Sequence, residues 1–147
     1  MSDKSAMPKN KQIRVVFDTN IWIHFLWSNK LAIIDKYIFN KTIQLIYSDE
    51  TINELTEILS RKKFRNRISL NQIDELLIMF ENYGQKFNIV SSHEICRDKK
   101  DNFLINLCID SKADYLITGD ADLLVCDLSP QTTILTISNF IDLLNKK

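Results

Sequence analysis

Glycine and histidine are scarce in this chain, and their scarcity excludes several kinds of catalytic site. Only two of the 147 residues are glycines, Gly84 and Gly119, so neither a G-x-G-x-x-G dinucleotide turn nor a Walker phosphate-binding loop is present. The two histidines, His24 and His93, do not form an H-E-x-x-H zinc helix. A Rossmann site and a P-loop NTPase are therefore excluded, and neither histidine is assigned a role.

Cysteines and long apolar runs are also sparse, which bears on the cellular setting. The three cysteines (Cys96, Cys108, Cys126) lack C-x-x-C spacing and indicate neither a zinc ribbon nor a disulfide framework. No apolar run approaches the roughly 18 residues of a membrane span, and the polar first residues do not resemble a signal peptide. We expect a reduced, cytoplasmic protein that does not associate with membranes.

Charge and length indicate one ordinary globular domain. The 19 Lys and Arg residues balance the 19 Asp and Glu residues, which excludes a globally basic surface but allows local patches. A chain of 147 residues corresponds to about one domain. We predict a flexible tail over residues 1–11 and a single domain over residues 12–147.

Short β-branched runs alternate with segments of helical apolar spacing. Expected strands cover residues 13–17, 43–47, 86–90, 115–118 and 133–136. Expected helices cover residues 31–39, 49–60, 70–83 and 102–111, and Ser48 and Ser138 are the expected N-caps of the 49–60 helix and of a closing helix. This alternation favours an α/β fold, a three-layer α/β/α sandwich with a central parallel sheet.

Carboxylates follow two of the expected strands. Asp18 comes directly after residues 13–17, and Asp120 and Asp122 come after residues 115–118. Any one of them alone could be a turn or helix-cap residue. In a parallel sheet, however, ligands gather at the carboxyl ends of the strands, and acids on adjacent strands repel one another unless a divalent cation lies between them.

Two further acids come from helices. Glu54 lies at the boundary of the apolar face of the 49–60 helix, whereas Glu50 and Glu57 face solvent. Asp101 begins the most apolar helix, where the alternative is a first-turn acid that interacts with the helix dipole. Asp98 is interpreted as a loop or capping residue. A set of carboxylates without histidine suits Mg²⁺ or Mn²⁺, one ion or two, and such sites serve phosphoryl transfer.

Four motifs in this order resemble the PIN-domain family, and they are closest to the toxin components of bacterial toxin–antitoxin pairs. The resemblance covers about residues 13–144 and rests on D-T-N at 18–20, S-D-E-T-I-N-E-L at 48–55, R-D-K-K-D-N-F-L at 97–104 and T-G-D-A-D-L-L at 118–124. It implies a metal-dependent ribonuclease with RNA, a small antitoxin and a second copy of the chain as candidate partners. The implied catalytic residues are Asp18, Glu54, Asp101 and Asp120; the implied metal ligands are Asp18, Asp101, Asp120 and Asp122; the supporting residues are Asn20 and Thr118.

A basic stretch over residues 61–67 and two tryptophans complete the candidate features. The stretch is interpreted as an RNA-binding patch with Phe64 available for base stacking, or else as a solvated helix end. Trp22 and Trp27 are expected in the core or on a hydrophobic contact surface. The basic residues are Arg61, Lys62, Lys63, Arg65 and Arg67.

Other functional classes stay open at this point. A non-catalytic binding module could keep the fold and the acidic pocket, and a housekeeping RNA-processing nuclease could share the chemistry without an antitoxin. A phosphoacceptor receiver domain also gathers aspartates at strand ends, but the last expected strand lacks the lysine that it would need.

Overall fold

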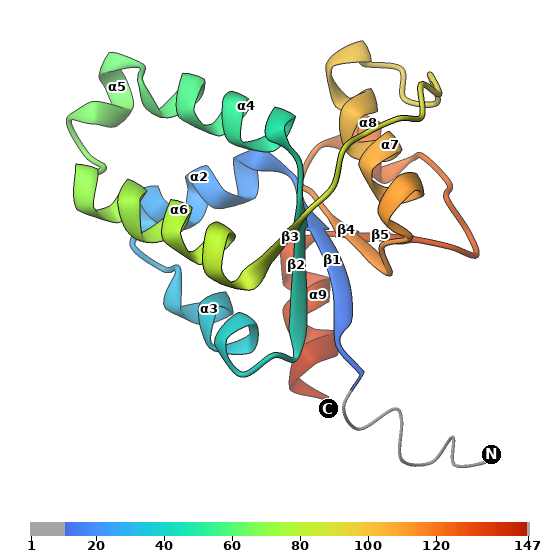
Figure 1. The fold of residues 1–147 in the computed structure, drawn as a ribbon, viewed down its shortest axis with the longest axis horizontal. Helices are drawn as coiled ribbons and strands as arrows, with labels where there is room; N and C mark the ends of the chain where they lie inside the picture. The colour runs from blue at the N-terminus through green and yellow to red at the C-terminus, as the bar shows by residue number, and fades with distance from the viewer. Residues whose placement is uncertain (1–10, 147) are drawn as a thin grey trace.

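Five short strands form one all-parallel sheet in the computed structural model, which describes residues 11–146 (Figure 1). The predicted tail lies outside the described residues, apart from Lys11. The strand order is β3-β2-β1-β4-β5, so the first strand lies at the centre of the sheet. The strands are β1 (Ile13–Phe17), β2 (Ile43–Tyr47), β3 (Gly84–Lys86), β4 (Tyr115–Ile117) and β5 (Thr133–Leu135).

Alternate residues of β1 pack on opposite faces of the sheet. Val15 and Phe17 belong to the larger hydrophobic core, whereas Val16 belongs to a second core on the other face. Successive side chains of a strand point to opposite faces, so a central strand that is apolar throughout requires cover on both sides. The predicted α/β/α architecture is therefore confirmed, and Figure 1 shows the helices on either side of the sheet.

The larger core lies under the helices between residues 19 and 83 and the closing helix, and the helices over residues 102–111 and 121–124 cover the other face. Ser48 caps the helix that begins at Asp49 through the N–H of Thr51, as predicted. The closing helix begins earlier than predicted, because Thr136 rather than Ser138 is its N-cap and accepts the Asn139 N–H at 3.2 Å. The helices are α2 (Thr19–Ser28), α3 (Ala32–Phe39), α4 (Asp49–Leu59), α5 (Lys62–Arg65), α6 (Leu70–Tyr83), α7 (Asn102–Ser111), α8 (Ala121–Leu124) and α9 (Ile137–Asn145).

The third strand differs from the prediction. It begins at Gly84, directly after α6, and ends at Lys86. A Cβ on residue 84 would lie 2.6 Å from the Phe80 carbonyl oxygen, so close packing there requires glycine. The apolar residues that suggested a strand over 86–90 pack instead on the core beneath α7, where Phe87 and Ile89 are partly buried. Within residues 11–146, no helix is both long and apolar enough to cross a bilayer.

Candidate acidic site

The carboxyl ends of β1 and β4 bring two of the predicted acids to one place. Phe17 and Ile117 are register partners, and the Asp18 N–H donates to the Ile117 carbonyl oxygen at 2.8 Å. Asp18 therefore lies beside Thr118, the residue that follows β4, and Asp120 is two residues further along. Because of this register, Asp18 and Asp120 lie close together at adjacent strand ends, as predicted.

Thr118 connects the two strand-end acids. Its hydroxyl donates to Asp18 Oδ2 at 2.8 Å, and the hydroxyl oxygen, Thr118 Oγ1, accepts the Asp120 N–H at 3.0 Å. The other Asp18 oxygen accepts the Asn20 N–H at 3.2 Å, so Asp18 also caps α2. Burial raises the pKa of Asp18, and the charges of Glu54 and Asp120 raise it further, while the two hydrogen bonds lower it. Asp18 is thus a buried carboxylate held in one orientation.

Asp101 and Asp120 form the most strongly perturbed pair in the site. Burial, followed by the hydrogen bond to Asp120 and the charges of neighbouring acids, raises the pKa of Asp101 to about 8. The same hydrogen bond lowers the pKa of Asp120. One proton is therefore held by the pair near neutral pH. Asp101 Oδ2 is buried and has no hydrogen-bond partner in the described structure.

Asp98 joins this pair, a role that sequence reasoning missed. One carboxylate oxygen from each of Asp98, Asp101 and Asp120 lies within 4.8 Å of the others. Asp98 also caps a short 3₁₀ turn (Lys99–Asp101) through the Lys100 N–H, as its predicted capping role requires. A 3₁₀ turn has three residues per turn, so the side chains of residues 98 and 101 lie on the same side. The D-x-x-D spacing of Asp98 and Asp101 is the feature of the sequence that could have indicated this role.

Glu54 and Asp122 lie at the edges of this group. Glu54 is half-buried on α4 while Glu50 and Glu57 are exposed, as predicted, and its charge acts on Asp18. Asp122 accepts a hydrogen bond from Arg97 at 2.7 Å, in an ion pair. The structure thus brings Asp101 and Asp120 together with Asp98, places Asp18 and Glu54 beside them, and ties Asp122 to Arg97.

Two buried asparagines of α7 hold the chain segment that carries Asp98. The Asn102 side chain accepts the Cys96 N–H at 2.8 Å, and the Asn106 side chain accepts the His93 N–H at 2.9 Å. Asn106 also donates to the His93 carbonyl oxygen at 3.1 Å. Positions four apart lie on one face of a helix, so α7 binds the extended segment along its length. The segment then delivers Asp98 to the site.

Replacing Asn102 with alanine should weaken binding of Mn²⁺ while the fold is retained. The Cys96 N–H would lose its partner in a buried position, which costs about 1–3 kcal/mol of unfolding free energy, and Asp98 would lose its support. Thermal unfolding in chelator and titration with Mn²⁺ measure the two effects. Asn53→Ala, at an exposed position of α4, is the matched control. Unchanged Mn²⁺ affinity of Asn102→Ala would show that Asn102 does not position Asp98.

The tryptophans and Phe64 form contacts that the sequence did not reveal. Trp22 is fully buried, as expected for a core residue. Trp27 is half-buried, and its ring packs edge-on against Phe64 at a centroid distance of 5.6 Å. The Arg67 guanidinium lies 4.6 Å from the centroid of the Trp27 ring. Phe64 is therefore half-buried against Trp27, and its availability to a base stays a prediction.

The cations of the basic stretch differ in their partners. Arg61 forms an ion pair with Glu57 at 3.0 Å, whereas no ion pair involving Lys62, Lys63 or Arg65 occurs among residues 11–146. All four side chains belong to exposed residues.

We expect Arg65→Gln to weaken binding of RNA more than Arg61→Gln does. A phosphate must compete with Glu57 for Arg61, so binding at Arg61 releases fewer counterions from the RNA. Fluorescence anisotropy at several salt concentrations should therefore give a smaller salt slope for Arg65→Gln than for Arg61→Gln. Equal effects of the two substitutions would argue against direct phosphate contact by Arg65.

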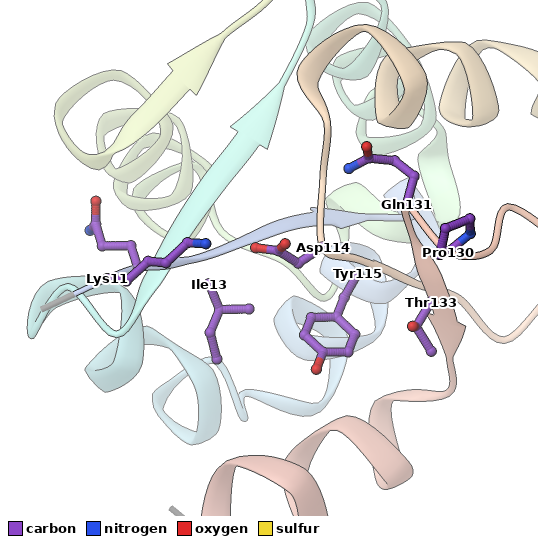
Figure 2. A pocket seen from close by; sticks show the side chains of 8 residues that line it. Lys11, Ile13, Asp114, Tyr115, Pro130, Gln131 and Thr133 are labelled. Atoms are coloured by element: carbon purple, nitrogen blue, oxygen red, sulfur yellow. The ribbon is translucent and has the colours of Figure 1, made fainter. Parts of the chain in front are cut away.

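A separate hollow lies at the opposite end of the sheet (Figure 2). It has a volume of about 390 Å³ and is lined by the first residues of three strands, Ile13, Tyr115 and Thr133. Its carboxylate, Asp114, already accepts the Arg14 N–H at 2.9 Å. Ligands of parallel sheets bind at the carboxyl ends of the strands, so we place the candidate site at the acids.

The fold and the acids define a class of protein, and comparison with known proteins agrees with it. The PIN-domain family model matches residues 14–122. An uncharacterized protein of Methanocaldococcus jannaschii is 33% identical over 137 residues, which cover 87% of this chain and 83% of that protein. The chain belongs to the PIN-domain family. Proteins of this family are generally nucleases, and nuclease is the functional class that membership supports.

Proposed function

We propose that this protein is a divalent-metal-dependent endoribonuclease. The observation that carries the proposal is the buried, unpartnered Oδ2 of Asp101, within a group of three carboxylates whose oxygens lie within 4.8 Å of one another. Three carboxyl groups at such distances cannot all be ionised without cost in the absence of a cation. A donor set made only of carboxylates suits Mg²⁺ or Mn²⁺, one ion or two.

The proposed ligands are Asp18, Asp101, Asp120 and Asp122, as the family resemblance implies, and Asp98 joins them on geometric grounds. A divalent ion held there supplies charge that polarises a phosphodiester and lowers the pKa of water. Side chains of the protein supply the orientation of the ligands and the proton transfer. Thr118 fixes the orientation of Asp18. We assign to Glu54, half-buried beside Asp18, the role of accepting a proton from the attacking water.

The biological role proposed is that of the toxin of a toxin–antitoxin pair, with a small antitoxin protein and a second copy of the chain as partners. The motifs around Asp18, Glu54, Asp101 and Asp120 support this role because they resemble that branch of the family. Growth arrest on induction, relieved by a small protein encoded next to this one, is the expected result. Cleavage of RNA without growth arrest would instead indicate a housekeeping nuclease.

The test of the chemistry is incubation of purified protein with mixed RNA in Mn²⁺ and, in parallel, in chelator. Internal cleavage that requires Mn²⁺ is the expected result, and single-stranded DNA of the same length serves as a comparison substrate. Cleavage that persists in chelator would contradict metal dependence. Binding of RNA without cleavage under either condition would favour the non-catalytic module.

A further inference from the structure

A groove next to the acidic site runs between α2 and α5. Its volume is about 240 Å³, and it is lined by Asn20, Ile23, His24, Trp27, Lys63 and Phe64. One end lies at the acids, because Asn20 donates its N–H to Asp18. The other end lies at Trp27, about 10 Å further along the axis of α2 at 1.5 Å per residue. The groove therefore leads from the acids to the basic stretch.

The lining of the groove combines polar groups with an aromatic surface. Asn20 and His24 are exposed and lie four residues apart, so both project from the same face of α2. An amide and an imidazole can each donate or accept hydrogen bonds. Beyond them, Trp27 and Phe64 pack edge-to-face at 5.6 Å and form an apolar wall. This is the surface that an unpaired nucleobase needs: polar groups for its edge and apolar contact for its face.

The charge at the far end of the groove favours a polyanion. Lys63 lines the groove with its ammonium group 5.0 Å from the centroid of the Phe64 ring, and Lys62 and Arg65 are exposed on the same short helix. No ion pair neutralises these three cations within the part of the chain that the structure describes. A nucleic acid strand whose backbone passes over α5 would meet them after one nucleotide enters the groove.

We propose that this groove binds one unpaired nucleotide of the RNA substrate, next to the phosphodiester held at the acids. The inference rests on the ribonuclease function proposed above and adds a nucleotide-binding subsite to it. His24 and Asn20 contact the base or ribose, Trp27 and Phe64 contact its face, and Lys63 holds the following phosphate. A space of about 240 Å³ takes one nucleoside.

Intrinsic fluorescence reports on this groove directly, because the chain has only two tryptophans and Trp22 is fully buried. Asp101→Asn protein with Mn²⁺ is titrated with a single-stranded RNA 10-mer, so that the RNA stays intact. We expect the RNA to quench emission and Trp27→Phe to remove most of this response. An RNA that is bound in an anisotropy titration without quenching Trp27 overturns the proposal.

Substitutions in the groove have matched controls elsewhere in the chain. His24→Ala should raise the Kd for the 10-mer about tenfold, which corresponds to about 1.4 kcal/mol, while His93→Ala, at another exposed histidine, should leave it unchanged. Lys63→Gln should reduce the salt slope by about 0.7, the value for one phosphate contact of a single strand. Lys36→Gln, on α3, should not change it. Groove variants that behave like these controls overturn the proposal.

Two further outcomes separate this inference from the proposed function. Mn²⁺-dependent cleavage by wild type, with the KM of His24→Ala unchanged, would support the nuclease function and refute nucleotide binding in the groove. Quenching of Trp27 by the 10-mer, in a protein that cleaves no RNA, would support the groove as a binding site and refute the placement beside a scissile bond. A perfect duplex of the same sequence that binds and quenches equally well would refute the entry of an unpaired nucleotide into the groove.

Discussion

Asp101→Asn is expected to abolish Mn²⁺-dependent cleavage of RNA, by more than about 100-fold, with the fold retained. The substitution keeps the shape of the side chain but removes one charge from the group formed with Asp98 and Asp120. Loss of a direct metal ligand should exceed the 10–100-fold cost that is typical of residues supporting the ligands. Initial rates on a labelled RNA over a range of Mn²⁺ concentrations measure the effect.

The controls for this experiment distinguish charge at the site from charge in general. Asp74→Asn removes a carboxylate from an exposed position of α6 and should cleave at the wild-type rate. Asp98→Asn should raise the Mn²⁺ concentration required for half-maximal activity if Asp98 is a ligand. A pure Asp101→Asn preparation that cleaves at the wild-type rate would contradict the assignment of the site.

Metal-free protein should become less stable as the pH rises from about 4 to about 8. The pKa of Asp101 is raised to about 8 in the folded protein, whereas an unfolded aspartate titrates near its model value of 3.8. Between these two values the folded state binds more protons than the unfolded state, so unfolding becomes progressively easier as the pH increases. Below pH 4 both states are protonated at this residue, and above pH 8 both are ionised. Thermal unfolding in chelator across this range measures the trend.

The Asp101→Asn variant should lose this dependence on pH, because an asparagine side chain does not titrate. An asparagine amide can donate to Asp120 as the protonated acid does, so the variant should melt above wild type in chelator at pH 8 and close to wild type at pH 5. Mn²⁺ at a hundredfold excess over its Kd should add about 2.7 kcal/mol to wild type, or about 5–10 °C for a domain of this size. The variant should gain much less.

Two results would show that the acids do not share a site. One is a variant that melts below wild type in chelator at pH 8, since removal of a repelled charge would then have no benefit. The other is an equal increase in melting temperature with Mn²⁺ for both proteins. Asp74→Asn should follow wild type at every pH and Mn²⁺ concentration, because its carboxylate is exposed.

Local patterns in the sequence were sufficient to predict the elements that position the site. The helices over residues 70–83 and 102–111 have the predicted bounds, because apolar spacing and capping residues act within a few turns. The parallel sheet follows from the alternation of strands and helices. Asp18 and Asp120 could be placed together because adjacent parallel strands end at one edge of a sheet.

Tertiary contacts decided the features that depend on residues far apart in the chain. Asp122 pairs with Arg97, 25 positions away, and the segment that follows β3 packs against α7 instead of extending the sheet. Phe64 meets Trp27 because α5 folds back over α2. No periodicity of 2 or 3.6 residues encodes such pairings, since that pattern states only which face of an element is apolar. What each face meets, and therefore the groove between α2 and α5, is determined by the packing of the whole domain.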